Sequence, residues 1–146
     1  MTFYLNGENT ESKAWQYVLP ASTSKLMIGK DLMEGKIFSG ILDDLRIYNR
    51  ALTDSEILSL YTNYASTATL PGFQNKLVAY YPFDGNANDS SEYANNGTAM
   101  GSSVTYVNSV KGKGVKLGNN SWIEVNDSDS LDIDKAFTFS AWVYRD

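Results

Sequence analysis

Short segments of β-type residues, separated by loops rich in Asn, Asp, Ser and Gly, run through nearly the whole sequence. The candidate strands are residues 2–5, 14–19, 25–29, 38–48, 77–83, 104–107, 114–117, 122–125 and 137–144. Many short strands joined by turn-rich loops are typical of a β-sandwich or barrel. We therefore predict an all-β fold built from antiparallel strands.

Two of these segments carry further information. The first ends on Asn6-Gly7, a strong hairpin signal, and residues 14–19 are the expected partner strand. The segment 137–144 alternates, with one row of side chains entirely apolar: Phe137, Phe139, Ala141 and Val143. Since alternate residues of a strand share a face, this row is expected to face the core, and Trp142 to pack between layers.

One segment reads as a helix. Thr53-Asp54-Ser55-Glu56 has the pattern of a capping box, in which Thr53 and Glu56 satisfy each other's backbone N–H groups. Apolar residues follow up to position 61 at helical spacing. We expect one short helix over 53–61 that covers an end of a sheet.

Composition limits the possible functions. The chain has 146 residues, enough for one domain with its own core. It contains neither Cys nor His, which excludes disulfides, the usual zinc sites and Ser-His or Cys-His nucleophiles. The net charge of −5 argues against nucleic acid and anionic membrane surfaces as partners, and no apolar run is long enough for membrane insertion. The N-terminus has no signal-peptide pattern, so we expect the chain to lack the true N-terminus of a secreted protein.

Two stretches resemble the laminin-G-like family of concanavalin A-like jelly rolls, which is common in bacterial surface and secreted proteins. Residues 38–61, FSGILDDLRIYNRALTDSEILSLY, are similar to the closing strand and capped helix of that family. Residues 77–98, LVAYYPFDGNANDSSEYANNGT, are similar to its opening segment, and the run from Gly112 onward follows its first half. The resemblance implies an antiparallel jelly-roll sandwich with an extracellular or cell-surface location.

The closing signature, however, precedes the opening one. We therefore divide the chain into a C-terminal jelly-roll half (1–62), a linker (63–76) whose one charged residue is Lys76, and an N-terminal half (77–146). Three explanations remain open. The chain can be the seam of a tandem array, a subunit that polymerises head-to-tail by completing halves between chains, or a circular permutant that has lost its middle strands. Exposed sheet edges would allow the self-association that the second explanation needs.

The loop after residue 83 is the first candidate site. It holds Asp84, Asn86 and Asp89, whose oxygen atoms are the ligand type that calcium prefers. The resemblance implies a calcium ion held by this loop, with Asp89 as the ligand, together with an acidic residue of the closing strand, Asp43 or Asp44. The alternative is a turn-rich loop whose Asx side chains bond their own backbone. Asp44 and Arg46 can also form an ion pair along one strand.

The function indicated is binding rather than catalysis. Glycoside hydrolases with this architecture need two carboxylates at a set separation, and no segment here has the usual E-x-D-x-x-E spacing. Trp15 and Tyr17 are candidates for stacking on a sugar ring. We expect a non-catalytic adhesion or binding module whose partner is a glycan or a surface protein. The alternatives are a filament-forming subunit and a carbohydrate-binding module attached to a hydrolase.

Overall fold

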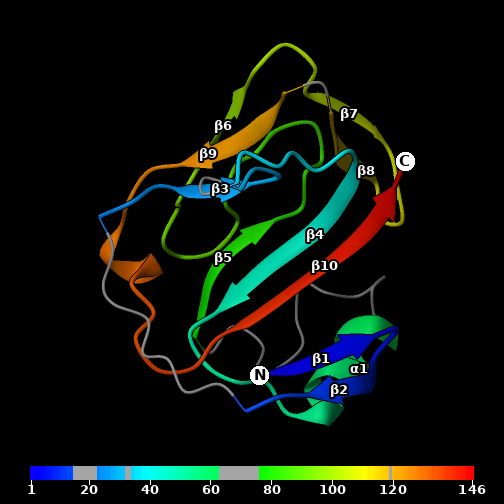
Figure 1. Ribbon diagram of the computed structural model, residues 1–146, viewed down its shortest axis with the longest axis vertical. Helices are drawn as coiled ribbons and strands as arrows, with labels where there is room; N and C mark the ends of the chain where they lie inside the picture. The colour runs from blue at the N-terminus through cyan, green and yellow to red at the C-terminus, as the bar shows by residue number, and fades with distance from the viewer. Residues whose placement is uncertain (15–22, 32–33, 63–75, 119) are drawn as a thin grey trace.

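The computed structural model describes residues 1–14, 23–31, 34–62, 76–118 and 120–146. It confirms the all-β prediction: antiparallel strands form a sandwich, with one short α-helix and one 3-10 turn among the described residues (Figure 1). The candidate strand at 14–19 and nearly all of the predicted linker lie outside the described residues.

The larger sheet has five strands arranged around one central strand. They are β4 (Gly40–Tyr48), β5 (Leu77–Tyr81), β7 (Thr105–Asn108), β8 (Lys113–Leu117) and β10 (Thr138–Arg145). On one side β4 pairs with β10 along its whole length. On its other side the first part of β4 pairs with β8 and the last part with β5, and β7 extends the sheet beyond β8. The buried pattern of β4 follows from this central place.

A three-stranded sheet covers the apolar side of the larger one. Its strands are β3 (Leu26–Ile28), β9 (Trp122–Val125) and β6 (Gly97–Met100), in the order β3-β9-β6. The main core lies between the two sheets, with Val115, Tyr81 and Ile123 fully buried in it. Strand β6, GTAM, was missed by the sequence analysis because it carries only one large apolar residue.

Strands from both sides of the predicted linker share the larger sheet. Leu45 of β4 lies opposite Tyr81 of β5, and Leu42 lies opposite Val115 of β8. The stretch that resembles a closing signature and the stretches that resemble an opening one therefore pack on one core within a single chain. Whether they derive from two neighbouring jelly rolls stays a prediction.

The N-terminal hairpin differs from the one expected. Asn6 and Gly7 do form its turn, with φ of 53° and 81°. Across this turn β1 (Thr2–Leu5) pairs with β2 (Glu8–Ser12), because the two-residue turn lets the next residues pair at once. Strand β2 is wholly polar and exposed, so its sequence carries no apolar alternation. The sequence therefore did not predict β2, and the strand predicted at 14–19 lies, from residue 15 on, outside the described residues.

The predicted helix is confirmed as α1 (Asp54–Thr62). The Thr53 N–H donates to Glu56 Oε2 at 2.8 Å, and the Glu56 N–H donates to Thr53 Oγ1 at 3.3 Å, which is the reciprocal pattern of a capping box. A second buried cluster forms between the helix and the sheet end: Tyr48, Leu52, Leu60 and Leu77. The helix thus covers one end of the larger sheet, as expected.

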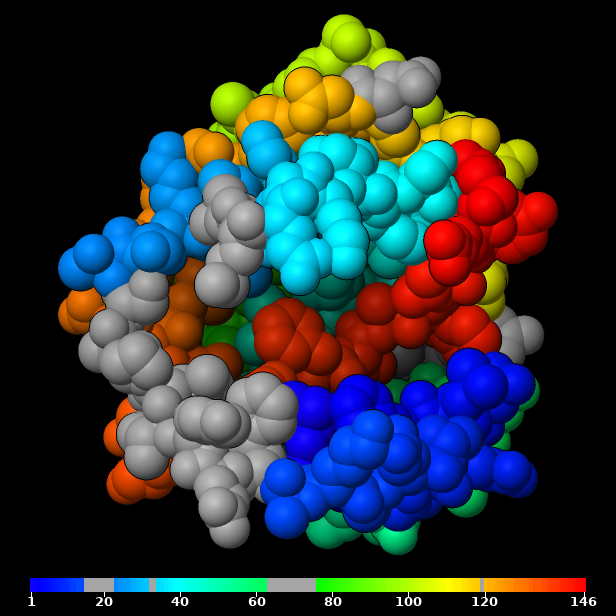
Figure 2. All heavy atoms as spheres, viewed as in Figure 1, coloured from blue at the N-terminus to red at the C-terminus, as the bar shows by residue number. Residues whose placement is uncertain are grey.

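Strand β10 corrects another expectation. It is at the edge of the larger sheet, and the row that was expected to face the core is largely exposed, with Phe139 at 54% and Val143 at 60%. Figure 2 shows β10 (red) at the surface between the N-terminal hairpin (blue) and the segment leading into β4 (cyan). The alternation was right, but the covering layer does not extend over this strand. Trp142, on its other side, contacts the ring of Tyr61, with centroids 5.5 Å apart.

Candidate functional site

Asp89, the first predicted calcium ligand, is saturated by hydrogen bonds from the protein itself. Its Oδ1 accepts from the backbone N–H groups of Tyr80 and Ser91, both at 2.8 Å. Its Oδ2 accepts from the Ser91 hydroxyl at 2.7 Å and the Asn95 N–H at 2.8 Å. With both oxygens occupied and the side chain buried, Asp89 fastens the loop after β5 to the strand it leaves.

Asn95 completes this fastening from the other end of the loop. Its side-chain amide donates to the Val78 carbonyl at 3.0 Å and to the Ser130 hydroxyl at 2.8 Å. Its own carbonyl accepts from the Tyr81 hydroxyl at 2.7 Å. The sequence does not indicate this role, because in an Asn-rich loop nothing distinguishes the Asn that becomes buried from those that stay exposed.

The other two predicted ligands of the loop have separate uses. Asn86 Oδ1 accepts from the Asn88 N–H at 2.8 Å, which is the Asx turn considered as the alternative to calcium binding. Asp84 Oδ1 accepts from the Lys113 N–H at 2.7 Å and so holds the β7–β8 turn. Both side chains therefore have a structural role in holding turns.

Asp43 and Asp44 lie in the middle of β4, where the strand is irregular. The register with β10 shifts between Ser140 and Trp142, and Asp44 has a φ of 53°. This β-bulge bends the ladder locally and places two consecutive carboxylates in the interior. Each aspartate is only 1% exposed. Two adjacent buried carboxylates are costly unless positive charges or hydrogen-bond donors accompany them.

Arg46 and Tyr80 supply part of that compensation. Arg46 Nη2 lies 3.4 Å from Asp44 Oδ1, and its Nη1 donates to the Asp44 carbonyl at 3.0 Å, so the predicted pair along the strand is present. The Tyr80 hydroxyl donates to Asp44 Oδ1 at 2.5 Å, and the Arg46 guanidinium lies over the Tyr80 ring at 4.2 Å. The site is therefore a buried cluster of charged side chains.

Asp43 is held by the turn between β7 and β8. The Lys111 N–H donates to its Oδ2 at 3.0 Å. Burial raises the pKa of Asp43, although the hydrogen bond from Lys111, the nearby Ser109 hydroxyl and the Asp44 N–H act in the opposite direction; the neighbouring Asp44 charge also raises it. Asp43 Oδ1 and Asp44 Oδ2 have no hydrogen-bond partner in the part of the chain that the structure describes.

These contacts test the calcium prediction. Calcium takes six to eight oxygen ligands, and two orphaned carboxylate oxygens would suit it. Yet the described residues contain no group of three or more acidic side chains placed to hold a metal ion. Asp89, the ligand from the loop, is occupied by four donors. The predicted set thus does not fit calcium as a single site in this arrangement, and calcium binding stays a prediction.

The aromatic side chains considered for stacking on a sugar ring do not form a site among the described residues. Trp15 and Tyr17 lie outside the described residues. Trp122 is half-buried, and the Lys30 ammonium lies 3.6 Å from the centre of its ring. That cation occupies one face of the indole, so Trp122 has no free stacking surface on that side.

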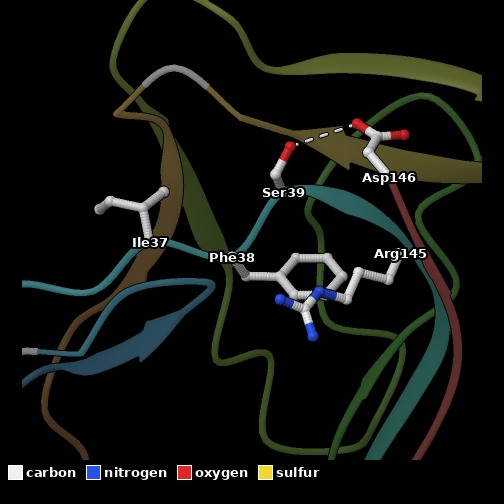
Figure 3. Close-up of a pocket in the computed structure, with 5 residues that line it drawn as sticks. All are labelled: Ile37, Phe38, Ser39, Arg145 and Asp146. Atoms are coloured by element: carbon white, nitrogen blue, oxygen red, sulfur yellow. Dashed lines mark hydrogen bonds between the residues drawn. The ribbon is translucent and has the colours of Figure 1, made fainter.

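A shallow cavity of about 450 Å³ lies where β4 begins and β10 ends. It is lined by Ile37, Phe38, Ser39, Arg145 and Asp146, and Figure 3 shows the Arg145 guanidinium beside the Phe38 ring. Asp146 accepts a hydrogen bond from the Ser39 hydroxyl at 3.2 Å. A glycine at position 40 is required here, because a Cβ would lie 2.2 Å from the Tyr144 carbonyl oxygen and 2.8 Å from Phe38. Sequence analysis did not find this cavity, because its residues are far apart in the chain.

Comparison with known families gives one match. The family model of the concanavalin A-like lectin/glucanases superfamily, Laminin_G_3, matches residues 1–58. This range contains most of the stretch 38–61 in which the closing signature was identified, whereas the resemblance of 77–98 rests on the sequence alone. No curated protein and no solved structure matched the chain. Within the described residues, no helix is long and apolar enough to cross a membrane.

Proposed function

Because the family model of the concanavalin A-like lectin/glucanases superfamily matches residues 1–58, we propose that the protein is a non-catalytic binding module of a bacterial surface or secreted protein. The family match carries this proposal. It supports a binding role in general, and the extracellular location is proposed because laminin-G-like domains are typically extracellular.

The cavity between β4 and β10 is the proposed ligand site. An aromatic ring beside an arginine and an aspartate offers an apolar platform with donors and acceptors, the combination that suits a sugar ring or a polar peptide segment. Glycoside hydrolysis needs two carboxylates across a cleft, and among the described lining residues Asp146 is the one carboxylate. This composition supports binding without catalysis.

A glycan array followed by calorimetric titration of the best glycan tests the proposal. We expect Arg145→Ala to weaken binding at least tenfold, because it removes the donors of the cavity. Lys135→Ala is the matched control, since Lys135 is exposed and lies outside the cavity. Equal affinity of Arg145→Ala and the unchanged protein would exclude this cavity as the ligand site.

Self-association through β10 is the second candidate function, favoured by a specific observation. Among the described strands β10 pairs on one side only, and the edge of a sheet is where a further strand can add. Phe139, Val143 and Tyr144 add exposed apolar surface, Tyr144 at 66%. If two copies paired antiparallel about Ala141, Phe139 of one would lie opposite Val143 of the other. The strand is thus complementary to itself.

Light scattering coupled to size-exclusion chromatography measures this directly. We expect a dimer or larger assembly at micromolar concentration, and a monomer for Val143→Lys, because a charge on a β edge opposes pairing. A monodisperse monomer of the unchanged protein at that concentration would remove self-association and leave the glycan-binding proposal standing.

A further inference from the structure

The buried aspartate pair of β4 needs more positive charge than its own strand supplies. Asp43 and Asp44 are each 1% exposed, and Arg46 is the nearest cation on β4, with Nη2 at 3.4 Å from Asp44 Oδ1. One guanidinium against two carboxylates would leave a net negative charge in the interior. Such a charge is strongly destabilising unless a second cation accompanies it.

Lys111 provides that second cation from the turn that precedes β8, the strand that pairs with the first part of β4. It lies in the turn between β7 and β8, and its Nζ is 3.8 Å from Asp44 Oδ2 while its backbone N–H donates to Asp43 Oδ2. A single residue therefore contacts both aspartates, one through the main chain and one through the side chain. With Arg46 included, two cations face two carboxylates.

The fold holds Lys111 in this place. The turn is closed by the Ser109 N–H, which donates to the Gly112 carbonyl at 3.2 Å. Gly112 has a φ of 66°, and any Cβ there would lie 2.2 Å from Asp84 Oδ1. Asp84 in turn accepts from the Lys113 N–H at 2.7 Å. The backbone of the turn is thus held on both sides of Lys111, which places this residue next to the carboxylates.

We propose that Lys111 is the built-in counter-ion of this aspartate pair and takes the part that a divalent metal ion would otherwise play. The pair has two oxygens without hydrogen bonds, Asp43 Oδ1 and Asp44 Oδ2, which mark where a cation is attracted. The ammonium next to Asp44 Oδ2 repels a metal ion from the same point and satisfies the charge without it. The protein then keeps its stability in the absence of calcium.

Thermal melting of the unchanged protein is the first test. We expect the same Tm in EDTA and in millimolar calcium chloride. A Tm that falls in EDTA and is restored by calcium would overturn the proposal, because a metal ion would then be the partner of the aspartates. This measurement needs no substitution and so does not depend on whether a variant folds.

Substitution of Lys111 is the second test. Lys111→Met keeps most of the apolar stem and removes the ammonium, and we expect the Tm to fall by about 5 °C. Lys111→Arg keeps the charge and should melt close to the unchanged protein. Lys113→Met is the matched control, because Lys113 is exposed at the start of β8, just after the turn, and no ion pair of its ammonium is found among the described residues. A loss in Lys111→Met no larger than that in Lys113→Met would overturn the proposal.

The pairing itself is measured by a double-mutant cycle. When Asp44→Asn is combined with Lys111→Met, the Tm should fall by less than the sum of the two single losses, since each removes the same interaction. Additive losses would show that Lys111 acts on stability by some route other than Asp44.

Discussion

Asp89 and the pair Asp43-Asp44 are all buried carboxylates, but the protein stabilises them in different ways. Asp89 is surrounded by neutral donors, three backbone N–H groups and one hydroxyl, that leave neither oxygen unpaired. The pair on β4 has one orphaned oxygen on each residue and is compensated by the charges of Arg46 and Lys111. Burial alone therefore does not tell whether a carboxylate accepts hydrogen bonds from neutral donors or is compensated by charged side chains.

The largest expected effect distinguishes the two kinds of carboxylate. Asp89→Asn should lower the free energy of unfolding by about 3 kcal/mol, because the new NH₂ group faces donors and leaves buried N–H groups without an acceptor. Chemical denaturation monitored by tryptophan fluorescence measures the loss. A cost below about 1 kcal/mol would mean that the loop is held by Asn95 and not by Asp89.

Tyr80→Phe sharpens the comparison from the other site. It removes the hydroxyl that donates to Asp44 Oδ1 and keeps the ring on which Arg46 lies. We expect a loss of about 1.5 kcal/mol, the range for a hydrogen bond to a charged group. The control is Tyr93→Phe, because Tyr93 is exposed. Equal stability of Tyr80→Phe and its control would show that Arg46 and Lys111 alone neutralise Asp44.

Glu56, a partly exposed carboxylate, is expected to give the smallest change in the free energy of unfolding. Arg50 donates twice to Glu56, at 2.8 and 2.7 Å, and this pairing lowers the pKa of Glu56 to about 2. Because the folded-state pKa is below the unfolded value, the stabilisation is complete above the unfolded pKa of about 4.5 and is lost as the pH falls towards 2.

Glu56→Gln should therefore cost about 1 kcal/mol at pH 7 and progressively less below pH 4.5. Urea denaturation at a series of pH values measures the difference between the two proteins. A difference that does not change with pH would assign the cost to the lost capping geometry of Thr53 and not to the charge.

Much of the fold could be predicted from local patterns. The capping box at Thr53 and Glu56, the Asn6-Gly7 turn and the alternating segment ending in β10 were all visible, because each depends on residues close in the chain. The partner of β1 was missed because β2 is polar and lies at the surface. The exposure of Phe139 and Val143 was missed because alternation predicts which residues share a face and not whether another layer covers that face.

The candidate site divides in the same way. The sequence identified Asp43, Asp44, Asp84, Asn86 and Asp89 as oxygen-rich positions, and all five are used in the structure. The sequence did not show that these residues have four different roles. Asp89 accepts hydrogen bonds from the loop backbone, Asn86 forms an Asx turn, Asp84 holds the β7–β8 turn, and Asp43 and Asp44 form a charged pair. That separation depends on which donor from a distant element reaches each oxygen, as Lys111 does for Asp43 and Tyr80 for Asp44.

Local patterns in the sequence were enough to predict an all-β chain with one capped helix and without cysteine or histidine chemistry, and to show a laminin-G-like resemblance at 38–61 and 77–98. Three-dimensional contacts were needed to show that strands from both sides of the predicted linker share a sheet, that Phe139 and Val143 of β10 are exposed and that Lys111 meets the buried aspartates. The physical reason is that pattern and propensity act over a few residues, whereas sheet order, burial and charge compensation arise between residues far apart in the chain.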